Sequence, residues 1–166
     1  GCLVGTHARD KDAVVAVMKL CEAAAYYRSQ GLTLCDQRER LFKKYGYFSE
    51  GLCTVTMKGV EGAKKIRDLL EKIRQNPPKR IGEYQVCAFR DYEKGSMLDC
   101  TTGKWSEIKL PKSNVLYFDL EEDAWCCVRP SGTEPKVKYY MGVKGINRED
   151  AAGKLERLTS AVKSLS

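Results

Sequence analysis

The sequence of 166 residues has a single histidine, only five prolines and no apolar run long enough to cross a membrane. The apolar stretch that begins at Ala13 is interrupted by Lys19 and Glu22, whereas a membrane span needs roughly 18 apolar residues with few or no charges. With 43% apolar and 31% charged residues, the composition is that of a folded soluble protein. Membrane anchoring is therefore not expected.

The chain also lacks the cysteine spacing of a metal site, although it contains eight cysteines. No two of them show the two-residue gap of a zinc knuckle, and the adjacent Cys126 and Cys127 would point to opposite faces of a strand. Four disulfides are one interpretation of this number. We favour reduced thiols that pack as small apolar side chains in a cytoplasmic protein, without a zinc site.

The net charge of +7 indicates an anionic partner, which is either a nucleic acid or a phosphorylated small molecule. The basic residues are scattered and mixed with acidic ones, which is also typical of solvated helix faces. Charge alone does not separate these interpretations.

Two helices are predicted at the N-terminal end. The first, from Asp12 to Gln30, is apolar on nearly every side and must be buried on most of them. The second begins at Thr33 with a capping box and ends at Gly46. The residues before Asp12 contain no sheet that covers the first helix, so we interpret residues 1–46 as the tail of a larger α/β domain.

The pattern from residue 52 onward predicts a complete small domain of the α+β class, an antiparallel sheet with helices on one face. The boundary between the two parts is predicted near residues 46–51. The predicted helices are 63–73 and a last one capped by Asn147; the predicted strands are 52–57, 84–92, 97–100, 115–120, 124–129 and 136–144.

The strongest local motif lies between two predicted strands, in Arg129-Pro-Ser-Gly-Thr-Glu-Pro-Lys136. Its prolines stiffen the loop, and Gly132 lets an anion approach the backbone. Ser131 and Thr133 add hydroxyl donors. No Gly-Lys-Ser/Thr follows, so this is not a nucleotide-binding phosphate loop. A tight strand connection is the alternative interpretation.

In this motif Arg129 offers a planar fork for bidentate contact with a phosphate. The backbone N–H groups of residues 131–133 are expected to form an anion-binding nest. Glu134 is expected either to orient Arg129 or to bond a sugar hydroxyl.

A second candidate site precedes the apolar helix, in the segment from Gly5 to Asp12. It brings together His7, Arg9 and Lys11 at a helix N-terminus, where the helix dipole favours phosphate. A histidine there is suited to accept a proton from a sugar hydroxyl. An exposed polar loop with a solvated histidine is the alternative.

These two motifs together resemble a known family. The segment 129–136 resembles the phosphate-binding loop in the C-terminal domain of the α-D-phosphohexomutases, the phosphoglucomutase and phosphomannomutase superfamily. The segment 3–13 resembles the stretch after the sugar-binding loop of that family, near the end of its third domain. The resemblance covers the whole chain and is closest to the branch of phosphoglucomutases and phosphopentomutases.

The resemblance implies a TATA-binding-protein-like α+β fold for residues 52–166, a hinge at 47–51, and residues 1–46 as the end of the third domain. It also implies a reaction in which an active-site phosphoserine donates its phosphate to a hexose monophosphate. The bisphosphorylated intermediate then turns around and returns its other phosphate, with Mg²⁺ assisting.

Carried over to this chain, the resemblance assigns a role to each motif residue. Arg129, Ser131, Gly132 and Thr133 would hold the phosphate that is not transferred, with Lys136 at the end of the loop and Glu134 orienting the substrate. His7 would be a proton acceptor, Lys11 a phosphate contact and Arg9 a further substrate-orienting residue.

The phosphoserine, metal and sugar loops of the family are absent from this sequence. We therefore expect these residues alone to be inactive and to bind no Mg²⁺. The expected partners are a phosphorylated sugar, with glucose favoured over pentose or mannose, and the missing N-terminal domains. Self-association through the apolar helix is a further expectation. A non-catalytic basic binding module is the alternative from another class, although nucleic acid is not expected.

Overall fold

The structure is a computed structural model that describes residues 3–6, 9–57 and 61–165. The chain divides into two compact units, residues 1–46 and 47–166, and each is described by itself. None of the described helices is long and apolar enough to cross a membrane.

The first unit contains helices α1 (Ala13–Ser29) and α2 (Leu34–Tyr45). The side chain of Asp12 accepts hydrogen bonds from the backbone N–H groups of Val14 and Val15 and so caps α1. Thr33 and Asp36 form the predicted capping box of α2, and their hydrogen bonds lower the pKa of the Asp36 carboxyl. The two helix starts that the sequence predicts are therefore present.

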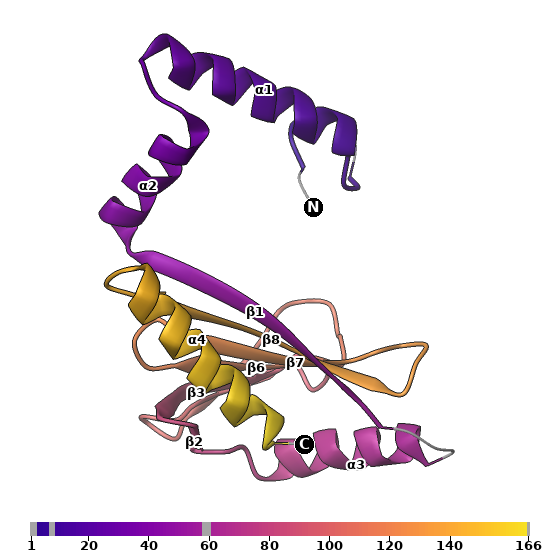
Figure 1. Cartoon of the computed structure of the whole chain (residues 1–166). Helices are drawn as coiled ribbons and strands as arrows, with labels where there is room; N and C mark the ends of the chain where they lie inside the picture. The colour runs from indigo at the N-terminus through magenta and orange to yellow at the C-terminus, as the bar shows by residue number, and fades with distance from the viewer. Residues whose placement is uncertain (1–2, 7–8, 58–60, 166) are drawn as a thin grey trace. The chain divides into compact units, whose positions relative to one another are not determined.

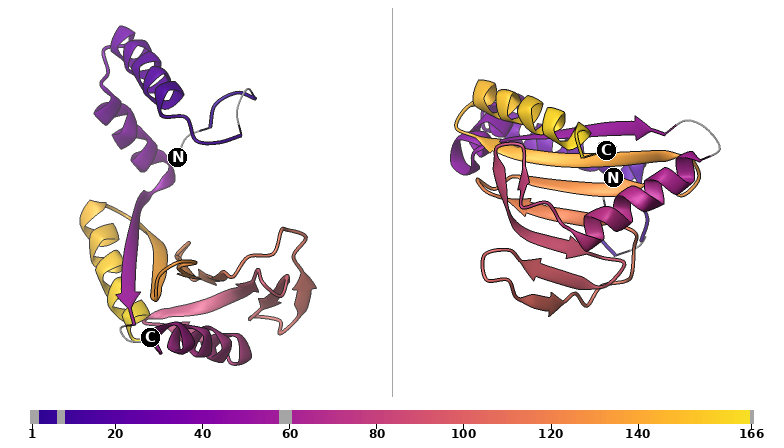
Figure 2. Two further views of the ribbon diagram at one scale, coloured as in Figure 1. Left: turned by 90° about the vertical axis from the view of Figure 1, so that its right-hand side faces the viewer. Right: turned by 90° about the horizontal axis from the view of Figure 1, so that it is seen from below.

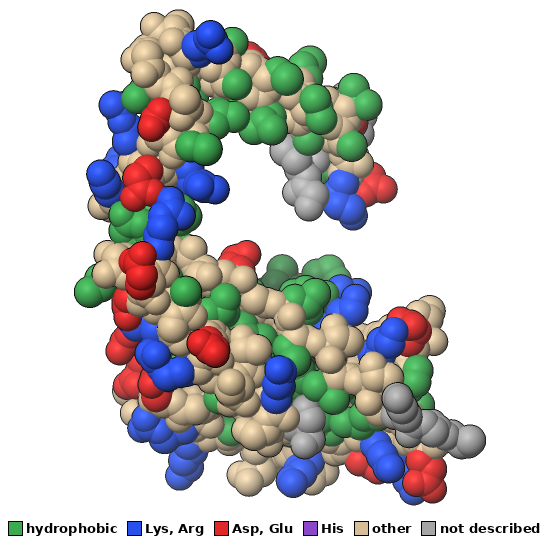
Figure 3. Space-filling model, in the orientation of Figure 1, with side chains coloured by type: hydrophobic (Ala, Val, Ile, Leu, Met, Phe, Trp, Pro, Cys, Tyr) green, Lys and Arg blue, Asp and Glu red, His purple; other side chains and the backbone are tan. Residues whose placement is uncertain are grey.

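The burial expected for α1 is not found in this chain. No residue of α1 is buried, and Val14, Leu20 and Tyr26 are 79%, 59% and 61% exposed. Figure 3 shows apolar side chains along the surface of this helix. Within its unit α1 packs only against α2, which is too small to cover a helix that is apolar on all sides.

The second unit is an antiparallel sheet with two longer helices (Figures 1 and 2). The strand order is β1-β8-β7-β6-β3-β4-β5, and β2 pairs with β3. The helices are α3 (Gly62–Gln75) and α4 (Arg148–Lys163). The strands are β1 (Tyr47–Thr56), β2 (Arg80–Ile81), β3 (Tyr84–Asp91), β4 (Ser96–Asp99), β5 (Trp105–Glu107), β6 (Leu116–Leu120), β7 (Trp125–Pro130) and β8 (Lys136–Gly145).

Helices α3 and α4 cover the same face of the sheet, as the sequence predicts for this α+β class (Figure 2). One continuous core joins Ile66 and Leu70 of α3 and Leu158 of α4 to alternate residues of the strands, among them Val137 and Tyr139 of β8. Each large apolar side chain that is buried in this layer stabilises the fold by roughly 1.5–3 kcal/mol. No helix in the described part of the second unit lies on the opposite face of the sheet.

The segment 47–51, expected as a hinge, is the first half of β1. It pairs with β8 from Tyr47 opposite Gly145 to Gly51 opposite Met141. A Cβ at position 51 would lie 3.1 Å from the Leu155 side chain. The glycine therefore permits close packing of α4 on the strand, and a segment held in a ladder is not a free linker.

The packing interpretation holds for the described cysteines of the second unit, which are buried or partly buried, but not for Cys21 and Cys35 of the first unit, which are exposed. All seven described cysteines are free. Cys126 is fully buried whereas Cys127 is only partly so, in agreement with opposite faces of a strand. Burial raises the pKa of the Cys126 thiol to about 12, so it stays protonated and acts as an apolar side chain.

We predict that Gly145→Ala destabilises the second unit. The added Cβ would lie 2.4 Å from the backbone nitrogen of Ala151, and overpacking of this kind typically lowers the free energy of unfolding by about 1–3 kcal/mol. Gly153→Ala is the matched control, because its Cβ would meet only the flexible end of Arg157 at 3.4 Å, and alanine favours a helix interior by about 1 kcal/mol. Urea denaturation followed by tryptophan fluorescence measures the free energy of unfolding of the two variants. Equal values would contradict the tight packing of α4 against the end of β8.

Candidate phosphate-binding site

The motif at 129–136 forms the connection between β7 and β8, which are neighbours in the sheet. The backbone N–H of Ser131 donates to the carbonyl of Lys136 over 2.8 Å, and the N–H of Lys136 donates to the carbonyl of Glu134 over 2.7 Å. The carbonyl of Pro135 accepts from Met57 at the end of β1 over 3.0 Å. These bonds close the loop and attach it to the edge strand.

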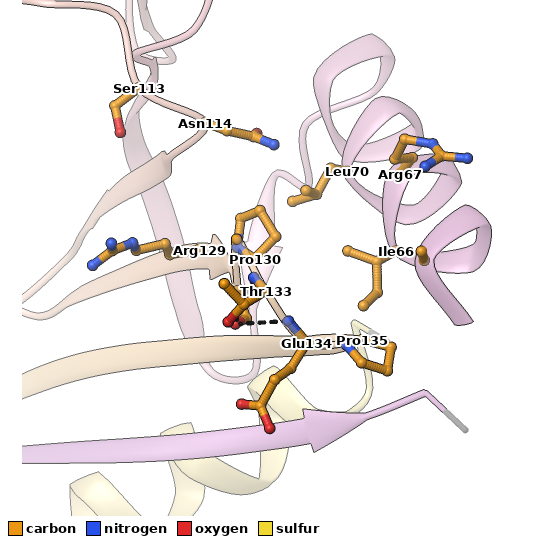
Figure 4. A pocket seen from close by; sticks show the side chains of 13 residues that line it. Ile66, Arg67, Leu70, Ser113, Asn114, Arg129, Pro130, Thr133, Glu134 and Pro135 are labelled. Carbon is orange, nitrogen blue, oxygen red and sulfur yellow. Dashed lines mark hydrogen bonds between the residues drawn. The ribbon is translucent and has the colours of Figure 1, made fainter. Parts of the chain in front are cut away.

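The donors of the loop differ from the expected nest in one respect. The Ser131 N–H closes the loop and is not free for an anion. The N–H groups of Thr133 and Glu134 instead point at the Ser131 hydroxyl oxygen, over 3.5 and 3.3 Å, as the close-up shows for Glu134 (Figure 4). Both distances are longer than the ordinary range of such bonds, so these amides are weakly engaged.

Arg129 stands directly opposite Lys138 in the β7 and β8 ladder. Like charges directly opposite each other in a sheet destabilise it, and neither side chain has an ion-pair partner among the described residues. Arg129 is exposed, and its guanidinium is directed away from Thr133 and Glu134 (Figure 4). An anion bound between these two cations would relieve their repulsion.

Glu134 does not orient Arg129 in this structure. Its carboxylate forms an ion pair with the Lys136 ammonium over 2.8 Å, because the two side chains leave the same turn two residues apart. This bond lowers the pKa of the Glu134 carboxyl. Lys136 is therefore held in an ion pair within the loop, whereas Arg129 and Lys138 form no ion pair among the described residues.

An open pocket of about 600 Å³ lies beside the loop (Figure 4). Its walls come from the loop, from one side of α3 and from the segment before β6. They are lined by Ala63, Ile66, Arg67, Leu70, Ser113, Asn114 and residues 129–135. The sequence offered no signal for Ser113 and Asn114, because only the tertiary fold brings them to a loop that follows a different strand.

The second motif belongs to the first unit. His7 lies outside the described residues. Arg9 and Lys11 are exposed, and the Lys11 ammonium lies 3.5 Å from the Asp10 carboxylate. The six loop residues with a predicted role lie together in the second unit, whereas Arg9 and Lys11 belong to the first.

The described residues do not fit a magnesium site. No group of three or more His, Cys, Asp or Glu side chains in 3–6, 9–57 and 61–165 is placed to hold a metal ion. Glu122 and Asp123, which are the right type for a hard cation, instead pair with Lys154 and Lys144 over 2.7 and 2.8 Å.

Comparison with known proteins relates the chain to one group of enzymes, although no family model matches it. A phosphoglucomutase of Staphylococcus aureus strain USA300 is 36% identical over 158 residues, which are 95% of this chain and 28% of that protein. The phosphoglucomutase of strain N315 is 34% identical over the same length. The chain thus spans a little more than a quarter of the length of the curated relatives it matches.

The fold has a counterpart among solved structures. The open form of the exocytosis-sensitive phosphoprotein pp63/parafusin, a phosphoglucomutase from Paramecium, matches with a TM-score of 0.57. The match covers 96% of this chain and 28% of that one, at 14% identity, and so concerns the fold alone. By its sequence and its fold, the chain belongs to the phosphoglucomutase family of α-D-phosphohexomutases and corresponds to their C-terminal portion.

Proposed function

We propose that the loop 129–136 binds the phosphate of a phosphorylated sugar, and that this chain is the phosphate-binding part of a phosphosugar mutase. The proposed reaction interconverts a hexose 1-phosphate and 6-phosphate, with glucose as the favoured sugar. Phosphopentomutase and phosphomannomutase specificities are the alternatives, since the residues that read the sugar hydroxyls are expected outside this chain.

The observation that carries the proposal is the pair of cations that β7 and β8 bring opposite each other beside the loop. Arg129 and Lys138 lie opposite each other, and no carboxylate among the described residues forms an ion pair with either to supply a close negative charge, although Lys138 contributes to the lowered pKa of Glu134. A phosphate monoester supplies that charge, and the planar guanidinium suits bidentate contact with its oxygens. The hydroxyls of Ser131 and Thr133 and the weakly engaged amides of Thr133 and Glu134 add neutral donors.

In the proposed reaction, this loop holds the phosphate that stays on the sugar and so fixes the distance of the other end from the phosphoryl donor. His7 is proposed to accept the proton of the attacking hydroxyl, and Lys11 and Arg9 to contact the substrate. The preceding domains of the longer protein are proposed as the partner that supplies the phosphoserine. The free cysteines are consistent with our proposal of a reducing, cytoplasmic location.

We predict that Arg129→Ala weakens the binding of inorganic phosphate and of glucose 6-phosphate at least tenfold. Charged hydrogen bonds of this kind contribute about 1.5–3 kcal/mol, and the exposed Arg129 has no described partner whose loss would disturb the fold. Isothermal titration calorimetry measures the affinity. Arg38→Ala on α2 removes the same charge from an exposed position and is expected to bind as the wild type does.

Gly132→Ala separates an anion site from a mere strand connection. An added Cβ would meet no atom within 4 Å, so the melting temperature should not change. If an anion approaches this backbone, the same Cβ obstructs it and phosphate binding weakens. Unchanged affinity in both Arg129→Ala and Gly132→Ala would leave the loop as a structural turn and refute the proposed function.

We predict that this polypeptide alone does not convert glucose 1-phosphate to glucose 6-phosphate above background. The described residues offer no metal cluster, and the phosphoryl donor is expected outside this chain. A coupled assay of glucose 6-phosphate measures turnover, with calorimetric phosphosugar binding by the same sample as proof of a folded site. Turnover by this chain alone would overturn the expectation.

A second candidate, single-stranded RNA binding, is suggested by the face of the sheet without helices. Tyr117 and Trp125 stack there with ring centres 5.7 Å apart, and the Arg90 guanidinium lies 5.3 Å from the Tyr117 ring. However, the two rings stack on each other, and Arg90 is paired with Asp119 over 2.7 Å. Tyr139 of the neighbouring strand β8 is buried and cannot stack on a base.

We therefore predict no saturable binding of a short single-stranded RNA at physiological salt. Fluorescence anisotropy at low and at physiological salt is the measurement, because phosphate-backbone contacts weaken steeply as salt rises. RNA binding that falls with salt and is removed by Tyr117→Ala would favour the second candidate over the first.

A further inference from the structure

A buried ion pair lies next to Asn114, which lines the pocket beside the phosphate-binding loop. The Arg74 side chain of α3 is 7% exposed, and its Nε lies 3.2 Å from Oδ2 of Asp91 at the end of β3, whose side chain is 2% exposed. The other carboxylate oxygen of Asp91 accepts from the backbone N–H groups of Glu93 and Lys94, over 3.0 and 3.2 Å. Both members are thus held from several sides, which fixes the direction of the guanidinium.

The Arg74 guanidinium also contacts Asn114, a residue of the pocket wall. Its Nη2 donates to Oδ1 of Asn114 and also pairs with the Glu93 carboxylate. Because arginine carries only donors, the atom of Asn114 that faces it must be the carbonyl oxygen. The amide nitrogen of Asn114 is thereby turned away from Arg74, and no acceptor for it is found among the described residues.

Asn114 lines the pocket that the phosphate-binding loop also lines. In Figure 4 its side chain extends from its segment toward α3, with the nitrogen at its tip and the loop residues Pro130 and Thr133 across the pocket. An NH₂ group with free hydrogens is a donor that suits the oxygens of a phosphate or of a sugar hydroxyl. The pocket therefore presents donors from two walls that are far apart in the sequence.

We propose that Asn114 contacts the phosphosugar bound at the loop 129–136, donating a hydrogen bond from its Nδ2, and that Arg74 is the positioning residue that holds this amide in the donor orientation. This inference rests on the proposed function and adds a second wall to its site. Asp91 keeps Arg74 in place and has no direct contact with the ligand.

Asn114→Asp tests the ligand contact. The carboxylate keeps the shape of the side chain and strengthens its bond to Arg74, so the melting temperature should stay equal or rise. It replaces the NH₂ donor by an oxygen that repels phosphate, so the affinity for glucose 6-phosphate should fall tenfold or more by calorimetry. Glu71→Gln, which removes an exposed carboxylate 4.0 Å from Arg74, is the control and should bind as the wild type does.

Arg74→Lys tests the positioning role. Lysine keeps a positive charge beside Asp91 but lacks the second nitrogen that reaches Asn114. The affinity should fall, and Asn114→Asp should weaken binding less in the Arg74→Lys background than in the wild type, because coupled residues are not additive. Additive effects on the affinity would overturn the positioning role.

The outcomes separate this inference from the proposed function. If the wild type binds glucose 6-phosphate and Arg129→Ala does not, wild-type affinity in Asn114→Asp would refute the contact by Asn114 alone. If the wild type binds neither inorganic phosphate nor glucose 6-phosphate, the proposed function fails and the inference falls with it.

Discussion

The packing of α3 and α4 on a single face of the antiparallel sheet decides where the side chains of the site can go. Because side chains alternate along a strand, burial of Cys126 and Val128 under the helices turns Cys127 and Arg129 to the other face. The pairing of β7 with β8 then sets Lys138 beside Arg129. The apolar layer thus sets the position of the charged pair, although none of its atoms belongs to the site.

The local electrostatics of the loop divide its cations into two groups. Lys136 is engaged by Glu134 within the same turn, whereas Arg129 and Lys138 repel each other across the ladder. Such a repulsion is modest in an exposed position because water screens it. It nevertheless places two positive charges beside a loop that also holds hydroxyl and amide donors, and this combination distinguishes the loop from an ordinary strand connection.

Membership of the phosphoglucomutase family accounts for features of the first unit that are unusual for an isolated chain. Helix α1 is apolar around its circumference, yet none of its residues is buried. The matched relatives are more than three times as long as the segment they share with this chain, and we propose that another part of such a longer protein covers this helix. The glycine at the end of α2, Gly46, has a φ of 108°, so the helix ends there and β1 begins at once.

Local interactions account for what the sequence alone determined. The helix caps at Asp12, Thr33 and Asn147, the alternation in β6 to β8 and the composition of the loop 129–136 all depend on residues a few positions apart, and they predicted the elements and the candidate phosphate loop. The resemblance to the mutase family implied a hinge at residues 47–51. Their place in β1 depends on β8, almost a hundred residues away, and on α4 packing over Gly51.

Only the tertiary structure decided the partners of the loop. The opposition of Arg129 and Lys138, the engagement of Glu134 by Lys136 and the orientation of Asn114 by Arg74 arise from strand pairing and from the docking of α3. The sequence identified which residues could bind a phosphate, since this depends on chemical type and local flexibility. It could not show which of them are already paired, since a hydrogen bond or ion pair depends on which distant segments the fold brings within about 3 Å.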